Sequence, residues 1–349
     1  MNELLTQVFG LIGVGLVGFV FFLFLAPLET LSWWTGLYNR RNKDRTKLAK
    51  PKDIVMPPIK PAPHYIIFLD GIAKVARDNY EDVQKFLDRL EKNLPGAVVI
   101  GSVLPYSVTN RPLTSARPLA RYWRWAKARK TGNYKDLIGF SINIRNMFQV
   151  IVSADSRYGP IYNLGAARLI IEPLLKKGYP IGSGVPVTLI GYSGGAQVAA
   201  GAAPYIKELL RAPVDLISLA GVISADPGLN DVRFLYHLAG SKDGVENIGA
   251  VLCPGRWPIL PNSSWNRAKR AGKFTYVPMG PMKHNGEGSY LDDKAALGNG
   301  KNFLEHTLET VTFIIKQPEA VRAKRVKKGK LEYLFDPLGP ESPHIKGAL

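Results

Sequence analysis

Short apolar runs alternate with amphipathic segments through most of this chain. Runs that are rich in apolar residues and bounded by Gly, Pro, Asn or Asp predict strands. They are 65–69 (YIIFL), 97–100 (AVVI), 185–190 (VPVTLI), 214–223 (VDLISLAGVI), 232–238 (VRFLYHL) and 274–277 (FTYV). Because most of these runs show no alternation with polar residues, they suit strands that are buried on both faces.

Segments with helical periodicity separate the strands. The predicted helices are 79–92, 196–210 and 302–316. In the first of them, apolar residues recur at i, i+3, i+4 and i+7 from Val83 to Leu90, which is one face of a helix. Strands that alternate with helices predict an α/β fold with a mostly parallel sheet and helices on both faces.

A long apolar segment precedes this domain. Val8 to Leu28 contains no charged residue, and its 21 residues suffice to cross a hydrocarbon core of about 30 Å as a helix. Interfacial aromatic residues and then basic residues follow: Trp33, Trp34, Tyr38, Arg40, Arg41, Lys43, Arg45, Lys47, Lys50 and Lys52. We therefore expect residues 1–39 to be a transmembrane helix with its interfacial segment. Residues 40–63 are expected to form a basic, Pro-rich linker beside the lipid.

A cleaved signal peptide is the alternative interpretation of this segment. Signal peptides have a basic n-region and a small-residue cleavage site, whereas the residues before Val8 include Glu3 and no Lys or Arg, and no A-x-A site follows. A retained single-pass anchor is favoured, and the positive charges after it place the large domain on the cytoplasmic side. Cys253 is the one cysteine, so the chain has no internal disulfide framework.

The formal net charge of +18 favours acidic partners, either an anionic membrane surface or nucleic acid. The predicted domain, 64–316, has an insert at about 105–160 that contains the basic and aromatic stretch 116–130 (ARPLARYWRWAKARK). This stretch is typical of an interfacial segment or a lid. Two alternatives are a surface helix whose Trp residues pack on the domain and a segment that binds single-stranded nucleic acid. A basic C-terminal tail occupies 317–349. The apolar segment favours an anionic lipid surface, so no nucleic-acid partner is expected. The sequence does not identify any protein partner.

The motif Gly191-Tyr192-Ser193-Gly194-Gly195 has the spacing G-x-S-x-G. An apolar strand is predicted directly before it and a helix directly after it, which is the context of a nucleophilic serine on a tight strand-to-helix turn. The alternative is a Gly-rich phosphate cradle, but the G-x-G-x-x-G spacing is missing. We predict that Ser193 is a nucleophile and that Gly194 donates its backbone N–H to an oxyanion. A second donor is expected after the first strand, from Gly71 or Ile72, although the neighbouring Asp70 is unusual there.

A serine nucleophile needs a base, and the base needs an acid that orients it. The histidines are His64, His237, His284, His306 and His344. His284 opens a loop after a late strand, where a mobile imidazole is expected, whereas His237 lies in an apolar run and suits the core. Asp226, Asp231 and Asp243 lie between the serine and this histidine. Asp243 is preferred because it lies in a turn directly after a strand, and Asp226 stays the alternative.

The strand with its Asp-Gly loop, the GYSGG motif, the GSKDGV turn and the KHNGEGSYL loop together resemble the α/β-hydrolase superfamily over residues 64–316. The resemblance implies an eight-stranded, mostly parallel sheet and cofactor-independent, metal-independent hydrolysis of esters, thioesters or amides. The chain departs from that pattern because its insert lies between the fourth strand and the strand before the serine, whereas lids more often follow the sixth strand.

The expected function is that of a membrane-anchored serine hydrolase that cleaves an amphiphilic or lipid-like ester or thioester. An acyltransferase with the same triad is one alternative, and a non-catalytic scaffold or assembly factor at the membrane is another.

Overall fold

The computed structural model describes residues 2–24, 61–72, 81–103, 137–298 and 300–317. The chain divides into two compact units. The larger unit comprises residues 49–105 and 163–349, and the smaller comprises residues 1–48 and 106–162.

One parallel sheet forms the centre of the larger unit. Its strands are β1 (Tyr65–Leu69), β2 (Val98–Val103), β3 (Val187–Tyr192), β4 (Val214–Leu219), β5 (Leu235–Ala239) and β6 (Phe274–Pro278). They lie in the order β2-β1-β3-β4-β5-β6, and every neighbouring pair is parallel. The described residues thus contain six strands in this sheet, where the family resemblance implies eight. The fold is α/β, as the hydrophobic pattern predicts.

The strands match the predicted apolar runs, with two informative differences. The run 214–223 ends as a strand at Leu219 because Ala220 takes a positive φ of 51°, which no extended strand can continue. The third strand extends to Tyr192, so that it reaches the predicted nucleophile. The insert lies between the second and third of the described strands.

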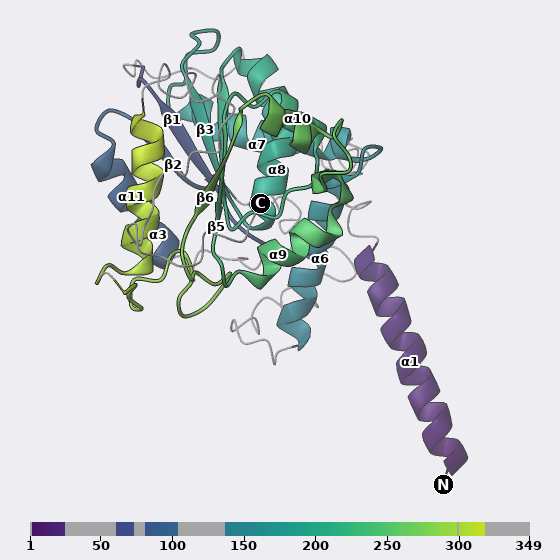
Figure 1. Cartoon of the computed structure of the whole chain (residues 1–349). Coiled ribbons are helices and arrows are strands. Elements are labelled where there is room, and N and C mark those ends of the chain that lie inside the picture. The colour runs from purple at the N-terminus through teal and green to yellow at the C-terminus, as the bar shows by residue number, and fades with distance from the viewer. Residues whose placement is uncertain (1, 25–60, 73–80, 104–136, 299, 318–349) are drawn as a thin grey trace. The chain divides into compact units, whose positions relative to one another are not determined.

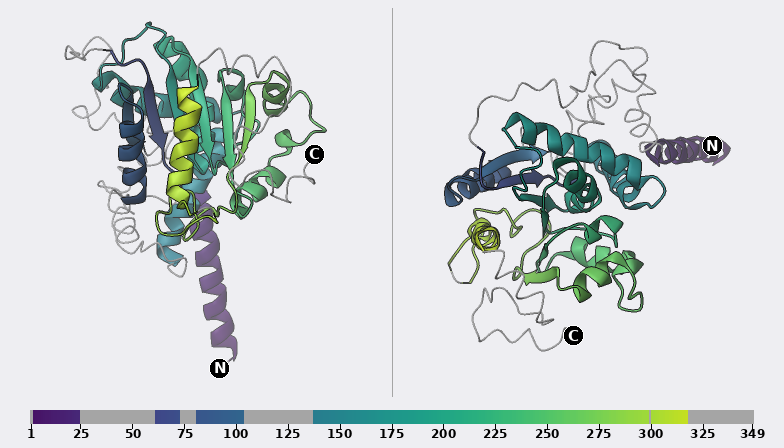
Figure 2. Two further views of the ribbon diagram at one scale, coloured as in Figure 1. Left: turned by 60° about the vertical axis from the view of Figure 1, so that its left-hand side comes forward. Right: turned by 90° about the horizontal axis from the view of Figure 1, so that it is seen from above.

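Two helices cover one face of the sheet, α3 (Glu81–Asn93) and α11 (Phe303–Lys316) (Figure 1). Helix α3 buries Val83, Phe86, Leu87 and Leu90 in the same core cluster as Leu304 and its neighbours on α11. Helix α11 begins with a capping box, in which the Asn302 side chain accepts the Glu305 N–H and the Glu305 side chain accepts the Asn302 N–H. Figure 2 shows both helices on the same side of the sheet.

The opposite face carries α8 (Gly194–Leu210) and the part of α7 (Gly159–Lys176) that follows residue 162 (Figure 2). Helix α8 is rich in Gly and Ala, which lets it pack closely: a Cβ on Gly201 would collide with the Asn163 side chain of α7. The short helices α9 (Gly244–Leu252) and α10 (Ser264–Arg270), and the 3-10 turns η4 (Pro227–Asn230) and η5 (Pro254–Arg256), continue this layer.

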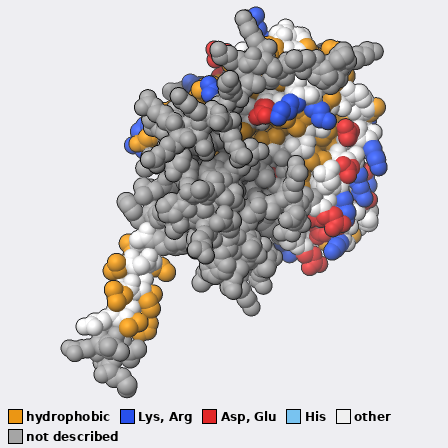
Figure 3. All heavy atoms as spheres, turned by 180° about the vertical axis from the view of Figure 1, so that it is seen from behind, with side chains coloured by type: hydrophobic (Ala, Val, Ile, Leu, Met, Phe, Trp, Pro, Cys, Tyr) orange, Lys and Arg blue, Asp and Glu red, His pale blue; other side chains and the backbone are white. Residues whose placement is uncertain are grey.

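The smaller unit contains α1 (Asn2–Phe24) and α6 (Leu137–Ala154). In Figure 3 the coloured side chains of α1 are almost all hydrophobic. Among the residues that the structure describes, no helix meets the combined length and apolarity of a membrane span. The linker 40–60, the stretch 116–130 and the tail from residue 318 lie outside the described residues, so their predicted roles stay predictions.

Candidate active site

Ser193 lies on a sharp turn between β3 and α8. Its φ of 53° and ψ of −127° are a strained conformation for a residue with a side chain. The turn is possible because glycines flank it. A Cβ on Gly195 would approach the carbonyl oxygens of Leu69 and Asp70 to 2.6 Å, and one on Gly191 would collide with the Ala196 backbone. This is the strand-to-helix turn that the G-x-S-x-G spacing predicts around Ser193.

The sheet order places this turn at a topological switch point. From β1 the chain continues to β2 on one side and then to β3 on the other. Ligands of open parallel sheets bind at the carboxyl ends of strands where the order reverses in this way. Ser193 follows β3 at that edge, and Gly71, just after β1, lies against it: a Cβ on Gly71 would be 3.1 Å from the Ser193 Cβ.

His284 and Asp243 complete a hydrogen-bonded chain with Ser193. The Ser193 Oγ is 2.8 Å from the His284 Nε2, and the His284 Nδ1 is 2.9 Å and 3.0 Å from the two carboxylate oxygens of Asp243. Asp243 is fully buried, whereas Ser193 and His284 keep 6% and 9% of their surface exposed. The structure thus brings together the three residues that the sequence analysis selects.

Asp243 is held by three further groups. Its Oδ1 accepts the backbone N–H groups of Val245 and Glu246, because it is the N-cap of α9. Its Oδ2 accepts the Tyr290 hydroxyl at 3.0 Å, and that hydroxyl in turn accepts the Gly240 N–H at 2.6 Å. Burial, followed by the Asp243 charge, raises the pKa of Tyr290, so the phenol stays protonated and donates. Sequence reasoning does not identify Tyr290, whose partners are up to 50 positions away.

The loop that carries His284 is fixed from its backbone. The Tyr192 hydroxyl donates to the His284 carbonyl oxygen at 2.6 Å, and the Lys283 N–H donates to the Gly288 carbonyl at 2.9 Å. Gly286 and Gly288 take φ values of 75° and 77°, which glycine adopts at no steric cost. The imidazole is therefore positioned by a closed loop, and the motif residue before Ser193 takes part in that positioning.

The predicted oxyanion donors differ in their surroundings. Gly194 is the first residue of α8, where backbone N–H groups have no acceptor inside the helix. The Gly71 N–H, by contrast, donates to the Asp70 carboxylate at 3.1 Å, and Asp70 is fully buried. An oxyanion would have to compete with that carboxylate for Gly71. Ile72 is half-buried beside it.

The rival acids have other partners. Asp226 is the N-cap of η4, accepts the Gly228 N–H at 2.7 Å and accepts the Gln197 amide at 2.6 Å. Burial raises the pKa of Asp226 to about 6. Asp231 forms an exposed ion pair with Lys207. Neither contacts His284 through a bond that the described residues show.

The other histidines also lie away from Ser193. The His64 Nε2 is 2.8 Å from the Thr188 hydroxyl, and His306 is buried in α11. His344 lies outside the described residues. His237 belongs to the core, as its apolar run predicts, and it is fully buried.

His237 is the centre of a second Ser–His–carboxylate set. Its Nδ1 is 2.9 Å from the Ser218 hydroxyl and its Nε2 is 2.9 Å from the Glu246 carboxylate. Arg256 donates to the same carboxylate at 2.6 Å and stacks over the ring of Trp265 at 4.3 Å. Burial lowers the pKa of His237, so its imidazole is uncharged at neutral pH, and Arg256 is the cation that stabilises the Glu246 carboxylate.

No substrate can approach this second serine in the described structure. Ser218 and His237 pair side by side on β4 and β5, and both are fully buried. A Cβ on Gly221 would collide with the Ser218 hydroxyl and lie 2.7 Å from the Ala196 Cβ. The set is a closed polar network inside the core, and sequence reasoning identifies only its histidine as a core residue.

The described residues contain no group of three or more His, Cys, Asp and Glu side chains arranged to hold a metal ion. No protein-family model matches the chain, and no curated protein matches it.

Proposed function

We propose that the protein is a serine hydrolase of the α/β-hydrolase kind that cleaves a carboxylic ester or thioester through an acyl-enzyme on Ser193. The observation that supports it most is the continuous chain from the Ser193 Oγ to the His284 Nε2 at 2.8 Å and from the His284 Nδ1 to Asp243 at 2.9 Å. In space, the candidate base lies between the candidate nucleophile and the acid that orients it, which is the arrangement that acyl transfer requires.

The first half-reaction forms the acyl-enzyme. The Ser193 Oγ attacks the carbonyl carbon of the substrate while the His284 Nε2 takes the hydroxyl proton. The negative charge on the carbonyl oxygen is stabilised by backbone N–H groups at the start of α8, with Gly194 first. The carbon–oxygen or carbon–sulfur bond then breaks, and His284 returns the proton to the leaving alcohol or thiol.

The second half-reaction releases the acid. His284 removes a proton from water, the resulting hydroxide attacks the acyl carbon, and the Ser193 Oγ leaves with the proton. Two backbone N–H groups and the Tyr290 hydroxyl donate to Asp243 and hold its carboxylate against the His284 Nδ1. Its charge stabilises the imidazolium that forms in each step.

We place this reaction at a membrane. The apolar segment Val8–Leu28 and the basic residues after it favour a single-pass N-terminal anchor with the catalytic domain on the cytoplasmic side. A membrane-bound hydrolase with a net charge of +18 suits an amphiphilic or lipid-like ester beside anionic lipid.

The test is labelling of the full chain in detergent with a fluorophosphonate, which reacts with activated serines. The variants are Ser193→Ala, His284→Ala and, as a matched control, Ser218→Ala from the buried set. We expect strong labelling of the wild type and of Ser218→Ala, and none of the other two.

Hydrolysis of p-nitrophenyl esters, measured on the same samples, should fall on the order of 10⁴-fold or more in Ser193→Ala. Absence of labelling in wild-type protein that unfolds cooperatively would overturn the proposal in favour of a non-catalytic scaffold. Conversion of added alcohol to a new ester would assign the second half-reaction to acyl transfer.

A further inference from the structure

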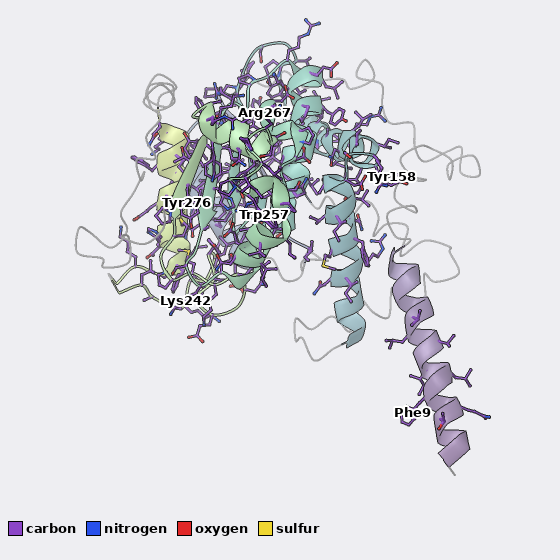
Figure 4. All side chains as sticks on the ribbon, turned by 45° about the vertical axis from the view of Figure 1, so that its right-hand side comes forward. Phe9, Tyr158, Lys242, Trp257, Arg267 and Tyr276 are labelled. Atoms are coloured by element: carbon purple, nitrogen blue, oxygen red, sulfur yellow. The ribbon has the colours of Figure 1, made fainter. Side chains whose placement is uncertain are left out.

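An apolar surface lies directly after the triad acid, on α9 and on the segment that follows η5. We name it the α9 surface; each of its members is at least 40% exposed. They are Val245, Ile248, Val251, Leu252, Trp257, Ile259 and Leu260. Figure 4 labels Trp257 on this side of the molecule. Seven such side chains within 16 residues of sequence form an unusual concentration, because exposed apolar residues on soluble proteins are usually scattered.

Helix α9 presents its apolar residues outward. Glu246 carries the only charge of the helix, and it is buried together with Gly249. A Cβ on Gly249 would come within 2.9 Å of the Val222 side chain, so this glycine marks the side on which α9 packs. On the solvent side, Ile248 and Leu252 stand one turn apart.

Helix α3 shows the ordinary arrangement for comparison. It buries its apolar residues and exposes charged ones, among them Glu81, Asp88 and Arg89. In Figure 3, acidic and basic side chains mix along the edge of the larger unit on which α3 and α11 lie. Helix α9 does the opposite of an ordinary surface helix, because it buries its charged residue and exposes its apolar residues. Such an exposed apolar face is expected to be covered by a partner.

Hydrogen bonds hold the second half of the α9 surface in one conformation. The Asn266 side chain of α10 donates to the carbonyl oxygens of Trp257 at 2.7 Å and Leu260 at 2.9 Å. The Arg270 side chain donates to the Pro261 carbonyl. The Trp257, Ile259 and Leu260 side chains are therefore presented on an ordered turn, and little conformational entropy is lost when they dock.

Along the chain, the segment that carries the α9 surface has exposed charges of one sign. From Gly244 to Lys273 the only acidic side chain is Glu246, which is buried and paired with Arg256. The exposed charged side chains of this stretch and of its N-terminal flank are all basic: Lys242, Arg267, Lys269 and Arg270. Lys242 and Arg267 are labelled with Trp257 in Figure 4.

We infer that the α9 surface docks on an anionic lipid bilayer. Apolar side chains that enter the acyl boundary, with Lys and Arg beside them at the headgroups, are the features of interfacial helices. A second copy of the chain is the poorer match, because a twofold contact would bring two basic rims together. Docking of α9 brings the edge of the sheet that carries Asp243 toward the lipid. Docking itself does not depend on catalysis, but its role in delivering a lipid ester to Ser193 rests on the proposed function.

The experiment uses a local probe on the full chain, so that a membrane anchor elsewhere in the chain does not decide the result. Leu252→Cys, in a Cys253→Ser background, is labelled with the fluorophore NBD. The protein is incorporated into vesicles of phosphatidylcholine with one-third phosphatidylserine, with and without doxyl-labelled lipid as quencher. The matched control carries NBD at Leu209→Cys, an exposed leucine of α8.

We expect the doxyl lipid to quench the probe at position 252 at least threefold more than the probe at position 209. This difference should shrink in vesicles of phosphatidylcholine alone and in 0.5 M salt. Equal quenching at the two positions would overturn the inference. So would a blue shift of the probe at position 252 that depends on protein concentration in detergent alone, which would assign the surface to a second copy.

Fluorophosphonate labelling of the same two preparations separates this inference from the proposed function. Equal quenching at positions 252 and 209, together with fluorophosphonate labelling, would overturn only the inference that the α9 surface docks on lipid. Stronger quenching at position 252 without fluorophosphonate labelling would overturn only the proposed hydrolase function.

Discussion

The larger unit contains two Ser–His–carboxylate sets with almost the same bond lengths and opposite surroundings. In the candidate active site the two links measure 2.8 Å and 2.9 Å, and in the buried set both measure 2.9 Å. The difference lies in the backbone: Ser193 occupies a strained turn at the end of β3, whereas Ser218 lies inside β4. Hydrogen-bond geometry alone therefore does not distinguish the two serines, which differ in backbone conformation and in exposure, 6% for Ser193 and 0% for Ser218.

The two imidazoles are also oriented in opposite ways. An ionised carboxylate only accepts hydrogen bonds, so the nitrogen that faces it carries the proton. In His284 this nitrogen is Nδ1, which leaves Nε2 to accept from the Ser193 hydroxyl. In His237 it is Nε2, and Nδ1 accepts from Ser218. Each carboxylate thus fixes a tautomer, and three substitutions separate the catalytic consequence from the structural one.

The largest expected effect comes from Asp243→Asn. The amide oxygen can still cap α9, but the amide NH₂ opposite His284 favours the wrong tautomer. We expect kcat for ester hydrolysis to fall roughly 10⁴-fold while the melting temperature changes little. The matched control is Asp226→Asn, which should leave kcat within about threefold. A large loss in the control and none in Asp243→Asn would transfer the acid's role to Asp226.

An intermediate effect, on stability, is expected from Glu246→Gln. The substitution removes the charge that neutralises Arg256, whose side chain is only 8% exposed. We expect the free energy of unfolding in urea to fall by about 3 kcal/mol. Glu172→Gln breaks the exposed pair with Lys176 and should cost less than about 0.5 kcal/mol. Equal losses in the two variants would show that the buried network contributes no special stability.

The stabilisation that Glu246 contributes should depend on pH. Burial raises the pKa of Glu246, but the hydrogen bonds from His237 and Arg256 and the charge of Arg256 outweigh burial and lower it below the ordinary 4.5. A depressed carboxyl pKa adds stability above the unfolded value, and this stability is lost as the pH falls below about 4.5. The difference in unfolding free energy between wild type and Glu246→Gln should therefore have its full value at pH 7 and shrink as the pH falls below about 4.5. A difference that stays constant down to pH 3 would contradict this account.

The smallest effect is expected from Tyr290→Phe. The variant removes one donor to Asp243 and the acceptor of the Gly240 N–H. We expect kcat/KM to fall roughly tenfold, because the remaining donors still hold the carboxylate. Tyr65→Phe removes another buried hydroxyl, which donates to the Gly178 carbonyl far from the site, and should lower stability by about 1 kcal/mol without a change in kcat/KM. Equal kinetic losses in both variants would mean that Tyr290 acts only on folding.

Much of the fold and the three residues of the candidate triad could be selected from the sequence, because their signals are local. The apolar run YIIFL coincides with β1, and the glycines around Ser193 are required by the turn itself. Asp243 and His284 could be ranked because each stands in a loop just after a strand. Their catalytic roles stay predictions until the variants are measured.

The contacts that escape sequence reasoning are those between segments distant in the chain. Ser218 meets His237 only because β4 and β5 pair in one register, and Tyr290 reaches Asp243 across 47 positions. The sequence also places an oxyanion donor at Gly71 without showing that the Asp70 carboxylate accepts its N–H. A single sequence contains no record of strand register, so such partners need coordinates.

The first turn of α9 belongs to both sets at once. Asp243 accepts the Glu246 N–H, and the Glu246 side chain binds His237 and Arg256 in the core. Opening this turn would release the triad acid and the buried network in one event, so the two form a single cooperative unit of local unfolding. The amide hydrogen of Glu246 then exchanges with solvent only when the core beneath it opens. The candidate active site therefore stays closed for as long as that core does.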